Sequence, residues 1–254
     1  SASGYLKWPL ALPNENQAVE NQTGVHPVSY DARSEGVITS VKDQGRFGTC
    51  WAFSALSLAE TELIKRDGWT QETDFSELHM AYFAYHQAAD PLGLITRDRM
   101  VPNGDYLQIG GNGYIATAML AKWAGAAAER VAPYSMIANA ANPANVTLNS
   151  GLAYNVNSAI LENAYWVDIA DREAIKGLIM AYGSAGIAYY SDASNRNNCY
   201  NAATASHYTP TARISDHAVT VVGWDDNYAK ANFKEQPTTV TAWSLILAAM
   251  VRGW

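Results

Sequence analysis

The order of helix-like and strand-like segments constrains the fold of this 254-residue chain more than any other feature. Apolar residues recur at helical spacing in four segments, which predicts helices at residues 50–66, 76–86, 114–123 and 171–182. Strand-like runs are concentrated later in the chain, at residues 164–169, 186–190 and 218–224, with an earlier β-branched run at residues 37–41. Helices followed by strands favour an α+β protein with a helical lobe and a sheet lobe.

The composition is that of an ordered globular protein, with 48% hydrophobic and 16% charged residues. A chain of this length can form one large domain or one domain built as two lobes. We expect a domain over residues 27–254, with a helical lobe at about 47–150 and a β-rich lobe at about 27–46 and 151–254. Residues 1–26 are polar and turn-rich, and we expect a leader, a remnant of a pro-segment or a surface arm.

Charge and residue spacing exclude several functional classes. A net charge of −7 without a Lys/Arg cluster argues against nucleic-acid binding. The longest apolar run, residues 245–251, is too short to cross a bilayer. His79 and His86 are not at the four-residue spacing of a zinc motif, so we expect neither a metal site nor a cofactor.

Cys50 stands where a helix is expected to begin, just after the polar turn at residues 42–45. Unpaired N–H groups at a helix N-terminus carry partial positive charge, which lowers the pKa of a thiol and favours the nucleophilic thiolate. A buried cysteine that only fills the core is the alternative interpretation. Two cysteines cannot build a dense disulfide framework. If Cys50 is catalytic, the other cysteine, Cys199, is left as a free thiol.

Residues 44–54 read Gln-Gly-Arg-Phe-Gly-Thr-Cys-Trp-Ala-Phe-Ser, which resembles the active-site signature of the papain (C1) family of cysteine peptidases. In that family a glutamine precedes the nucleophile by six residues and a tryptophan follows it, as Gln44 and Trp51 do around Cys50. The resemblance implies a papain-like fold, in which the active-site cleft lies between a helical lobe and an antiparallel, barrel-like β lobe.

Two further segments are similar to parts of the same family. Residues 215–224, Ser-Asp-His-Ala-Val-Thr-Val-Val-Gly-Trp, resemble its histidine strand and make His217 the candidate catalytic histidine. A satisfied core histidine is the alternative. The glycine-rich segment that lines the family's substrate cleft is similar to Gly110, Gly111, Asn112, Gly113 and Tyr114. An ordinary loop before a helix would have the same composition.

The resemblance also implies a mechanism. The Cys50 thiolate would attack a peptide carbonyl and form an acyl-enzyme, and the His217 imidazolium would protonate the leaving amine. The Gln44 side chain and the backbone N–H of Cys50 would stabilise the oxyanion. Substrate is expected to contact Gly110, Gly111, Asn112, Gly113 and Trp51.

The sequence departs from the family pattern in two places. Phe47 replaces a cysteine that forms a disulfide in the family, and Thr49 replaces Ser or Ala. Beyond the histidine strand the family has an Asn-Ser-Trp-Gly segment whose asparagine orients the histidine. Depending on the register, that asparagine position here holds Thr241, Leu247 or Ala248. Asn232, in the polar loop at residues 227–236, is a further candidate for that role. Two explanations of the departure compete: the C-terminal sequence is altered or truncated, or the domain has lost part of its machinery.

Three hypotheses follow. The chain is an active cysteine peptidase with a partly exposed thiol, a catalytically impaired papain-like domain that serves as a binding or surface-attachment module, or an aminopeptidase variant of the same fold. The joint presence of Gln44, Cys50 and His217 favours an active peptidase.

The resemblance is to secreted bacterial members of the family, which implies an extracellular or cell-surface location. A protein or peptide substrate is the expected partner, without nucleic acid or a membrane-spanning segment.

Overall fold

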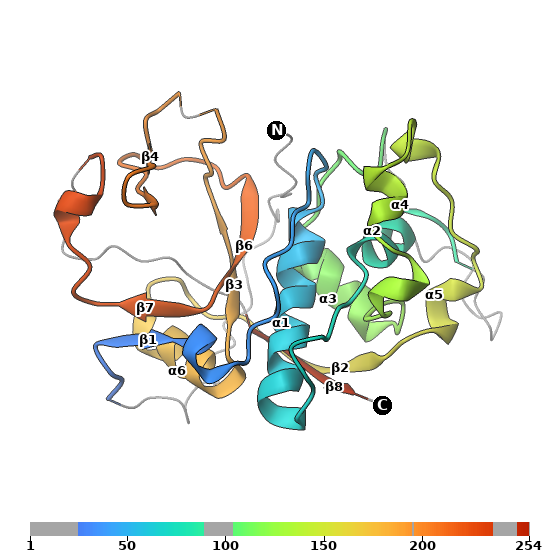
Figure 1. Ribbon diagram of the computed structural model, residues 1–254, viewed down its shortest axis with the longest axis horizontal. Coiled ribbons are helices and arrows are strands. Elements are labelled where there is room, and N and C mark those ends of the chain that lie inside the picture. Colours follow the sequence, from blue (N-terminus) through green and yellow to red (C-terminus); the bar gives the residue numbers. More distant parts are fainter. Residues whose placement is uncertain (1–24, 89–103, 195, 236–247, 254) are drawn as a thin grey trace.

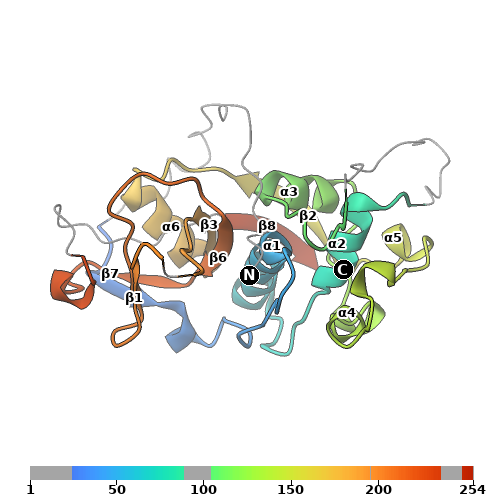
Figure 2. The ribbon, with the colours of Figure 1, turned by 90° about the horizontal axis from the view of Figure 1, so that it is seen from above.

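The computed structural model describes residues 25–88, 104–194, 196–235 and 248–253. Two lobes lie side by side, and the helix α1 (Cys50–Asp67) stands between them (Figure 1). One lobe contains the helices α2 (Glu77–Tyr85), α3 (Gly113–Ala121), α4 (Ser135–Ala138) and α5 (Leu152–Asn155). The other lobe contains α6 (Arg172–Tyr182) and most of the strands, and the view from above separates the same two groups on either side of α1 (Figure 2).

Among the residues that the structure describes, the strands form four antiparallel pairs. The pairs are β1 (Ser29–Asp31) with β7 (Gly223–Asp225), β2 (Ala159–Tyr165) with β8 (Ala248–Gly253), β3 (Ala185–Tyr189) with β6 (His217–Val221), and β4 (Tyr200–Asn201) with β5 (Ser206–His207). The expected α+β, two-lobed architecture is confirmed, but the helical lobe extends beyond the expected limit near residue 150, because Ala153 of α5 and Ala159 of β2 are buried in its core.

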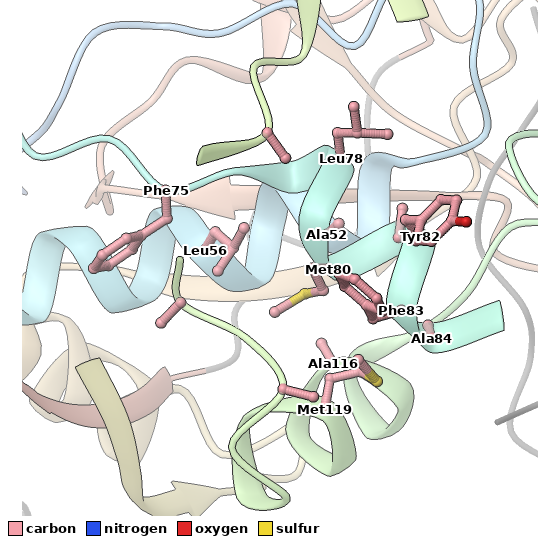
Figure 3. Packing of buried hydrophobic residues seen from close by; sticks show 14 of the residues in the cluster. Ala52, Leu56, Phe75, Leu78, Met80, Tyr82, Phe83, Ala84, Ala116 and Met119 are labelled. Atoms are coloured by element: carbon pink, nitrogen blue, oxygen red, sulfur yellow. The ribbon is translucent and has the colours of Figure 1, made fainter. Parts of the chain in front are cut away.

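Each lobe has its own hydrophobic core. The larger core joins Ala52 and Leu56 of α1 to Met80 of α2 and to Ala116 and Met119 of α3 (Figure 3). The smaller core packs one face of α6 against the β3/β6 pair and Trp224 of β7, through the residues Ile175, Leu178, Ile179, Ala185, Val221 and Trp224. Since α1 buries its apolar face in the larger core, its first turn is held rigidly where the two lobes meet.

The predicted helix at residues 171–182 is confirmed with both of its ends. The side chain of Asp171 accepts a hydrogen bond from the Ala174 N–H at 3.0 Å, which caps the first turn. Gly183 ends the helix at φ +89°, and its N–H donates to the Ile179 carbonyl. The predicted helices at residues 50–66, 76–86 and 114–123 also form, each displaced by no more than two residues at an end.

Two strand predictions are wrong in detail. Residues 37–41 do not form a strand, because side chains rather than a neighbouring strand hold this segment: Thr39 and Lys42 both bind the carboxylate of Glu60, at 2.9 Å and 2.6 Å. The strand expected at residues 164–169 is β2 and lies earlier, since its extent is set by antiparallel pairing with β8. The run at 218–224 forms β6 and β7, interrupted at Val222.

Candidate active site

The nucleophile and the histidine predicted from the sequence lie on facing elements. Cys50 is the first residue of α1, and its Sγ accepts a hydrogen bond from the backbone N–H of Ala218 at 3.5 Å. Ala218 follows His217, the first residue of β6. A second pair of bonds joins the same elements further along, because the Ser54 hydroxyl donates to the Val219 carbonyl at 3.0 Å and the Thr220 hydroxyl donates to the Ser54 carbonyl at 3.3 Å. The structure thus brings residues 50 and 217 to the same end of the α1/β6 contact.

The expectation of a partly exposed thiol is wrong, because Cys50 is 0% exposed. The start of α1 is packed against β6 on one side and against the segment around Gly111 on the other. Gly48 N–H donates to the Leu107 carbonyl at 2.6 Å, which closes that second side. His217 is only half-buried and lines a cleft, whereas Cys50 is not among the residues that line this cleft.

Burial lowers the pKa of His217, and the neighbouring carboxylate of Asp216 opposes that shift. Asp216 is itself held in place, because its Oδ1 accepts a hydrogen bond from the Ser191 N–H at 2.7 Å. The ring of Tyr189 lies beside the imidazole, with the centroids 5.8 Å apart. Among the described residues no hydrogen bond reaches either imidazole nitrogen.

Of the four candidates for orienting His217, two lie within the described residues, and each of these is held by other partners. Thr241 and Leu247 lie outside the described residues. Ala248 is the first residue of β8 and pairs with Tyr165 of β2 rather than with β6. Asn232 ends the 3-10 turn Lys230–Asn232, and its carbonyl accepts hydrogen bonds from the β4/β5 region, through Asn201, Thr204 and Ser206.

Gln44 lies in the loop that leads into α1. Its side-chain Nε2 donates a hydrogen bond to the Phe47 carbonyl at 2.7 Å, and its backbone carbonyl accepts one from the Phe47 N–H at 3.5 Å. Gln44 also lines the cleft that His217 lines. Because an amide nitrogen carries two hydrogens, one donor position of Gln44 is left for an oxyanion.

The glycine-rich segment lies against the start of α1. A Cβ at Gly111 would fall 2.4 Å from two ring atoms of Trp51, so only glycine fits at this position. Trp51 is 2% exposed, and the structure places it as a support beneath Gly111 rather than as a surface that substrate could touch.

The neighbours of Gly111 also have structural roles. Gly110 is at φ +85°, which favours glycine, and its carbonyl accepts a hydrogen bond from the Tyr85 hydroxyl. The side chain of Asn112 accepts from the Ile115 N–H at 3.0 Å and caps α3, of which Gly113 is the first residue. Gly110, Gly111 and Asn112 are buried, and Gly113 is half-buried.

The cleft beside the pair has a volume of about 660 Å³, within the range of ligand sites. Its walls are the segment at residues 38–45 and strand β6, and the side of α1 that carries Phe53, Ser54 and Ser57 completes it. Gln44 and His217 both contribute to the lining. A groove with an extended segment along one wall suits an extended peptide.

A buried ionic cluster anchors the loop before Gln44. The Nζ of Lys42 lies 2.6 Å from Glu60, 2.6 Å from Asp74 and 3.2 Å from Glu77. Burial raises the pKa of Glu77 to about 8, although Lys42 opposes the shift. Burial alone would lower the pKa of Lys42, but the carboxylates around it raise that pKa instead. Lys42 therefore stays charged and ties this loop to α1 and α2.

Sequence reasoning missed three contributors to the site. Asp216 lies within the histidine motif, where its position before His217 is the only sequence signal. Lys42 lies in the predicted turn, but nothing in the sequence pairs it with its carboxylates. Tyr134 contacts the loop that carries Gln44, and nothing in the sequence indicates that contact.

Within the described ranges no group of three or more His, Cys, Asp and Glu side chains is arranged to hold a metal ion. None of the described helices has the length and apolar character needed to cross a membrane.

Comparison with known proteins agrees with this geometry. The family model described as "Papain family cysteine protease" matches residues 26–236. Cathepsin K of Gallus gallus is 38% identical over 65 residues, which are 25% of this chain and 20% of that protein. Cysteine proteinase EP-B 1 of Hordeum vulgare is 34% identical over 103 residues, 35% of this chain and 27% of that protein. The chain thus aligns with less than a third of the length of either relative.

Solved structures share the fold. The cysteine protease and lectin-like domains of Cwp84, a surface layer associated protein of Clostridium difficile, match with a TM-score of 0.64 and 27% identity, over 90% of this chain and 44% of that one. The bromelain protease of Ananas comosus, in complex with the E64 inhibitor, matches with a TM-score of 0.55 and 21% identity, over 80% of this chain and 78% of that one.

Proposed function

Because the chain belongs to the papain family of cysteine proteases, we propose that it hydrolyses peptide bonds with Cys50 as the nucleophile and His217 as its proton partner. The observation that carries this proposal is the hydrogen bond from the Ala218 N–H to the Cys50 sulfur, which joins the start of α1 to the residue after His217. Proteins or peptides are the proposed substrates.

In the proposed reaction, the imidazole of His217 takes the thiol proton of Cys50, and the helix N-terminus stabilises the resulting thiolate. The sulfur attacks the carbonyl carbon, and the negative charge moves to the carbonyl oxygen. The remaining Nε2 hydrogen of Gln44 and the Cys50 backbone N–H donate to that oxygen. The C–N bond then breaks as His217 gives its proton to the amine. Water, activated by the same imidazole, hydrolyses the thioester and regenerates Cys50.

The half-buried position of His217 determines its role. Burial favours the neutral imidazole, which can accept the thiol proton, while the Asp216 carboxylate favours the imidazolium that forms next. In the absence of a described hydrogen-bond partner, we propose that packing against Tyr189 restrains the imidazole ring.

One observation favours the alternative function, a catalytically impaired domain that binds rather than cleaves. Cys50 is fully buried, and an inert core cysteine would have the same environment. The retained Gln44 and His217 in one cleft argue for the peptidase, since a binding module needs neither.

Covalent titration separates the two functions. We expect a peptidyl epoxide to label the chain with one equivalent, mapped by mass spectrometry to Cys50. The variant Cys199→Ser should label equally, and Cys50→Ser should not label at all. An unlabelled Cys50 in the folded chain would exclude the peptidase proposal. Hydrolysis of N-acetylated peptides would further separate an endopeptidase from an aminopeptidase, which needs a free amino terminus.

We further propose an extracellular or cell-surface location, which the likeness to a surface layer associated protein supports. The division into residues 1–26 and a peptidase domain over 27–254 stays a prediction. Immunodetection of the protein in culture medium, in surface extracts and in cell lysate would test the location.

A further inference from the structure

We propose that Tyr134 is a positioning residue for the oxyanion site, and that its hydroxyl holds together the loop that carries Gln44 and the nucleophile. The inference rests on the proposed peptidase function and adds a residue that lies far from the motif in sequence. Tyr134 comes from the helical lobe, immediately before α4.

The phenolic oxygen of Tyr134 touches both ends of the loop. It donates a hydrogen bond to the backbone carbonyl of Gln44 at 3.0 Å, and it lies 2.6 Å from the hydroxyl of Thr49. A phenol has a single hydrogen, so Thr49 must be the donor in the second bond. The result is a directed relay from Thr49 through Tyr134 to Gln44, in which each bond polarises the next.

The relay joins Gln44 and Thr49, and these two residues position the proposed oxyanion donors. Gln44 carries the side-chain amide, and Thr49 directly precedes Cys50, whose backbone N–H is the second donor. Oxyanion stabilisation depends on donors aligned in advance with the developing charge. A clamp between these two residues therefore sets the geometry of the site without contact to substrate.

Tyr134 is itself held on several sides. Its N–H donates to the carboxylate of Glu129 at 2.6 Å. Its ring contacts Phe53 of α1 edge to face, with the centroids 4.9 Å apart, and it meets Phe47 of the loop at 6.1 Å. The phenolic oxygen therefore has little freedom to move away from the loop.

The environment keeps the hydroxyl in its donating form. Burial raises the pKa of Tyr134 above its ordinary value, opposed by the Thr49 hydrogen bond, so the phenol stays protonated wherever a cysteine peptidase works. Without the hydroxyl, the backbone carbonyl of Gln44 would keep, among the described residues, only the long hydrogen bond from the Phe47 N–H at 3.5 Å. The Thr49 hydroxyl would lose its acceptor.

Tyr134→Phe is the direct test, because it removes the hydroxyl and keeps the ring contacts. We expect kcat for a fluorogenic peptide amide to fall about tenfold with KM within twofold, which is less than the loss of about 10² or more from deleting an oxyanion donor itself. Alkylation of Cys50 by iodoacetamide, which forms no oxyanion, should stay within twofold of the wild-type rate. The matched control is Tyr30→Phe, which deletes a hydroxyl that accepts from Lys65 in the other lobe.

A second variant tests whether the relay acts as a unit. Thr49→Val should lower kcat, and the double variant with Tyr134→Phe should lose no more activity than Tyr134→Phe alone. Hydrolysis by Tyr134→Phe at the wild-type rate would overturn the inference. An equal loss of hydrolysis and alkylation would also overturn it, since the hydroxyl would then act on the thiol or on the fold.

Hydrogen exchange provides a readout that does not depend on activity. In Tyr134→Phe, amides of residues 42–49 should exchange faster, while those of α6 should be unchanged. Unchanged exchange at residues 42–49 would refute the clamp even if the wild-type chain hydrolysed nothing. A wild-type chain that neither cleaves peptides nor reacts at Cys50 would refute the proposed function separately.

Discussion

Gly111→Ala is expected to damage both stability and the proposed catalysis, because the glycine lies against Trp51, the residue that follows Cys50. A Cβ at position 111 would lie 2.4 Å from the Cδ2 and Cε2 atoms of Trp51 and 2.6 Å from its Nε1. Carbon atoms in a packed core are normally about 3.5–4.0 Å apart. The overlap therefore exceeds 1 Å and involves the rigid indole ring rather than the end of a flexible side chain.

Trp51 cannot retreat without disturbing its surroundings. It is 2% exposed, and Tyr85 packs edge-on against it with the centroids 6.4 Å apart. Overpacking of this kind costs about 1–3 kcal/mol, and we expect Gly111→Ala to lower the unfolding free energy by about 3 kcal/mol. Because a small domain is stable by only about 5–15 kcal/mol, that loss is easily measured.

Urea denaturation followed by tryptophan fluorescence measures the effect. The matched control is Gly151→Ala, where the nearest atom is the side-chain Oδ1 of Asn149 at 3.2 Å, and the change should stay within about 0.5 kcal/mol. A Trp51→Phe partner tests the cause. If the indole is the obstacle, the double variant with Gly111→Ala should lose less than the sum of the two single losses. Additive losses, or equal effects of the two alanines, would refute the argument.

Three further predictions concern the site. Gln44→Ala should lower kcat/KM about 10²-fold to 10³-fold while Cys50 still reacts with iodoacetamide; wild-type kinetics would remove Gln44 from the mechanism. Since burial raises the pKa of Glu77 to about 8, the native state holds a proton that the unfolded chain releases above about 4.5, and stability should fall as pH rises between these values. Urea titrations across that range should show a shallower decline for Glu77→Gln, and an identical slope would contradict the assignment. The Asp216 carboxylate raises the pKa of His217, so removing it should lower that pKa. NMR titration of Cys50→Ser with and without Asp216→Asn measures the change, and a higher His217 pKa in the double variant would contradict this effect of Asp216.

The helices illustrate how far local sequence reaches. The ends of α6 are set by Asp171 and Gly183, and both signals lie within the segment that they bound. The start of α1 follows from the turn at residues 42–45 and the change to helical spacing at Cys50. These features depend on hydrogen bonds between residues that are close in the chain, so periodicity and capping chemistry predict them.

The strands required information that is not local. Residues 37–41 have the β-branched composition of a strand, yet they meet a side-chain cluster around Glu60 rather than a partner backbone. β2 forms where β8 lies beside it, and β8 comes from the far end of the chain. The composition of a segment indicates only that it can form a strand, whereas the packing of the whole fold determines which strand it pairs with.

By itself, the sequence determined the helical elements and the two-lobed fold class, and it identified the residues of the proposed thiol mechanism. Capping, periodicity and the motif around Cys50 each involve residues that are close together in the chain. Only the tertiary structure decided that this thiol is fully buried, that Trp51 supports Gly111 from below, and that Tyr134 bridges Gln44 and Thr49. Burial and such bridging contacts join residues that are distant in the chain, and their distances arise only when the lobes pack.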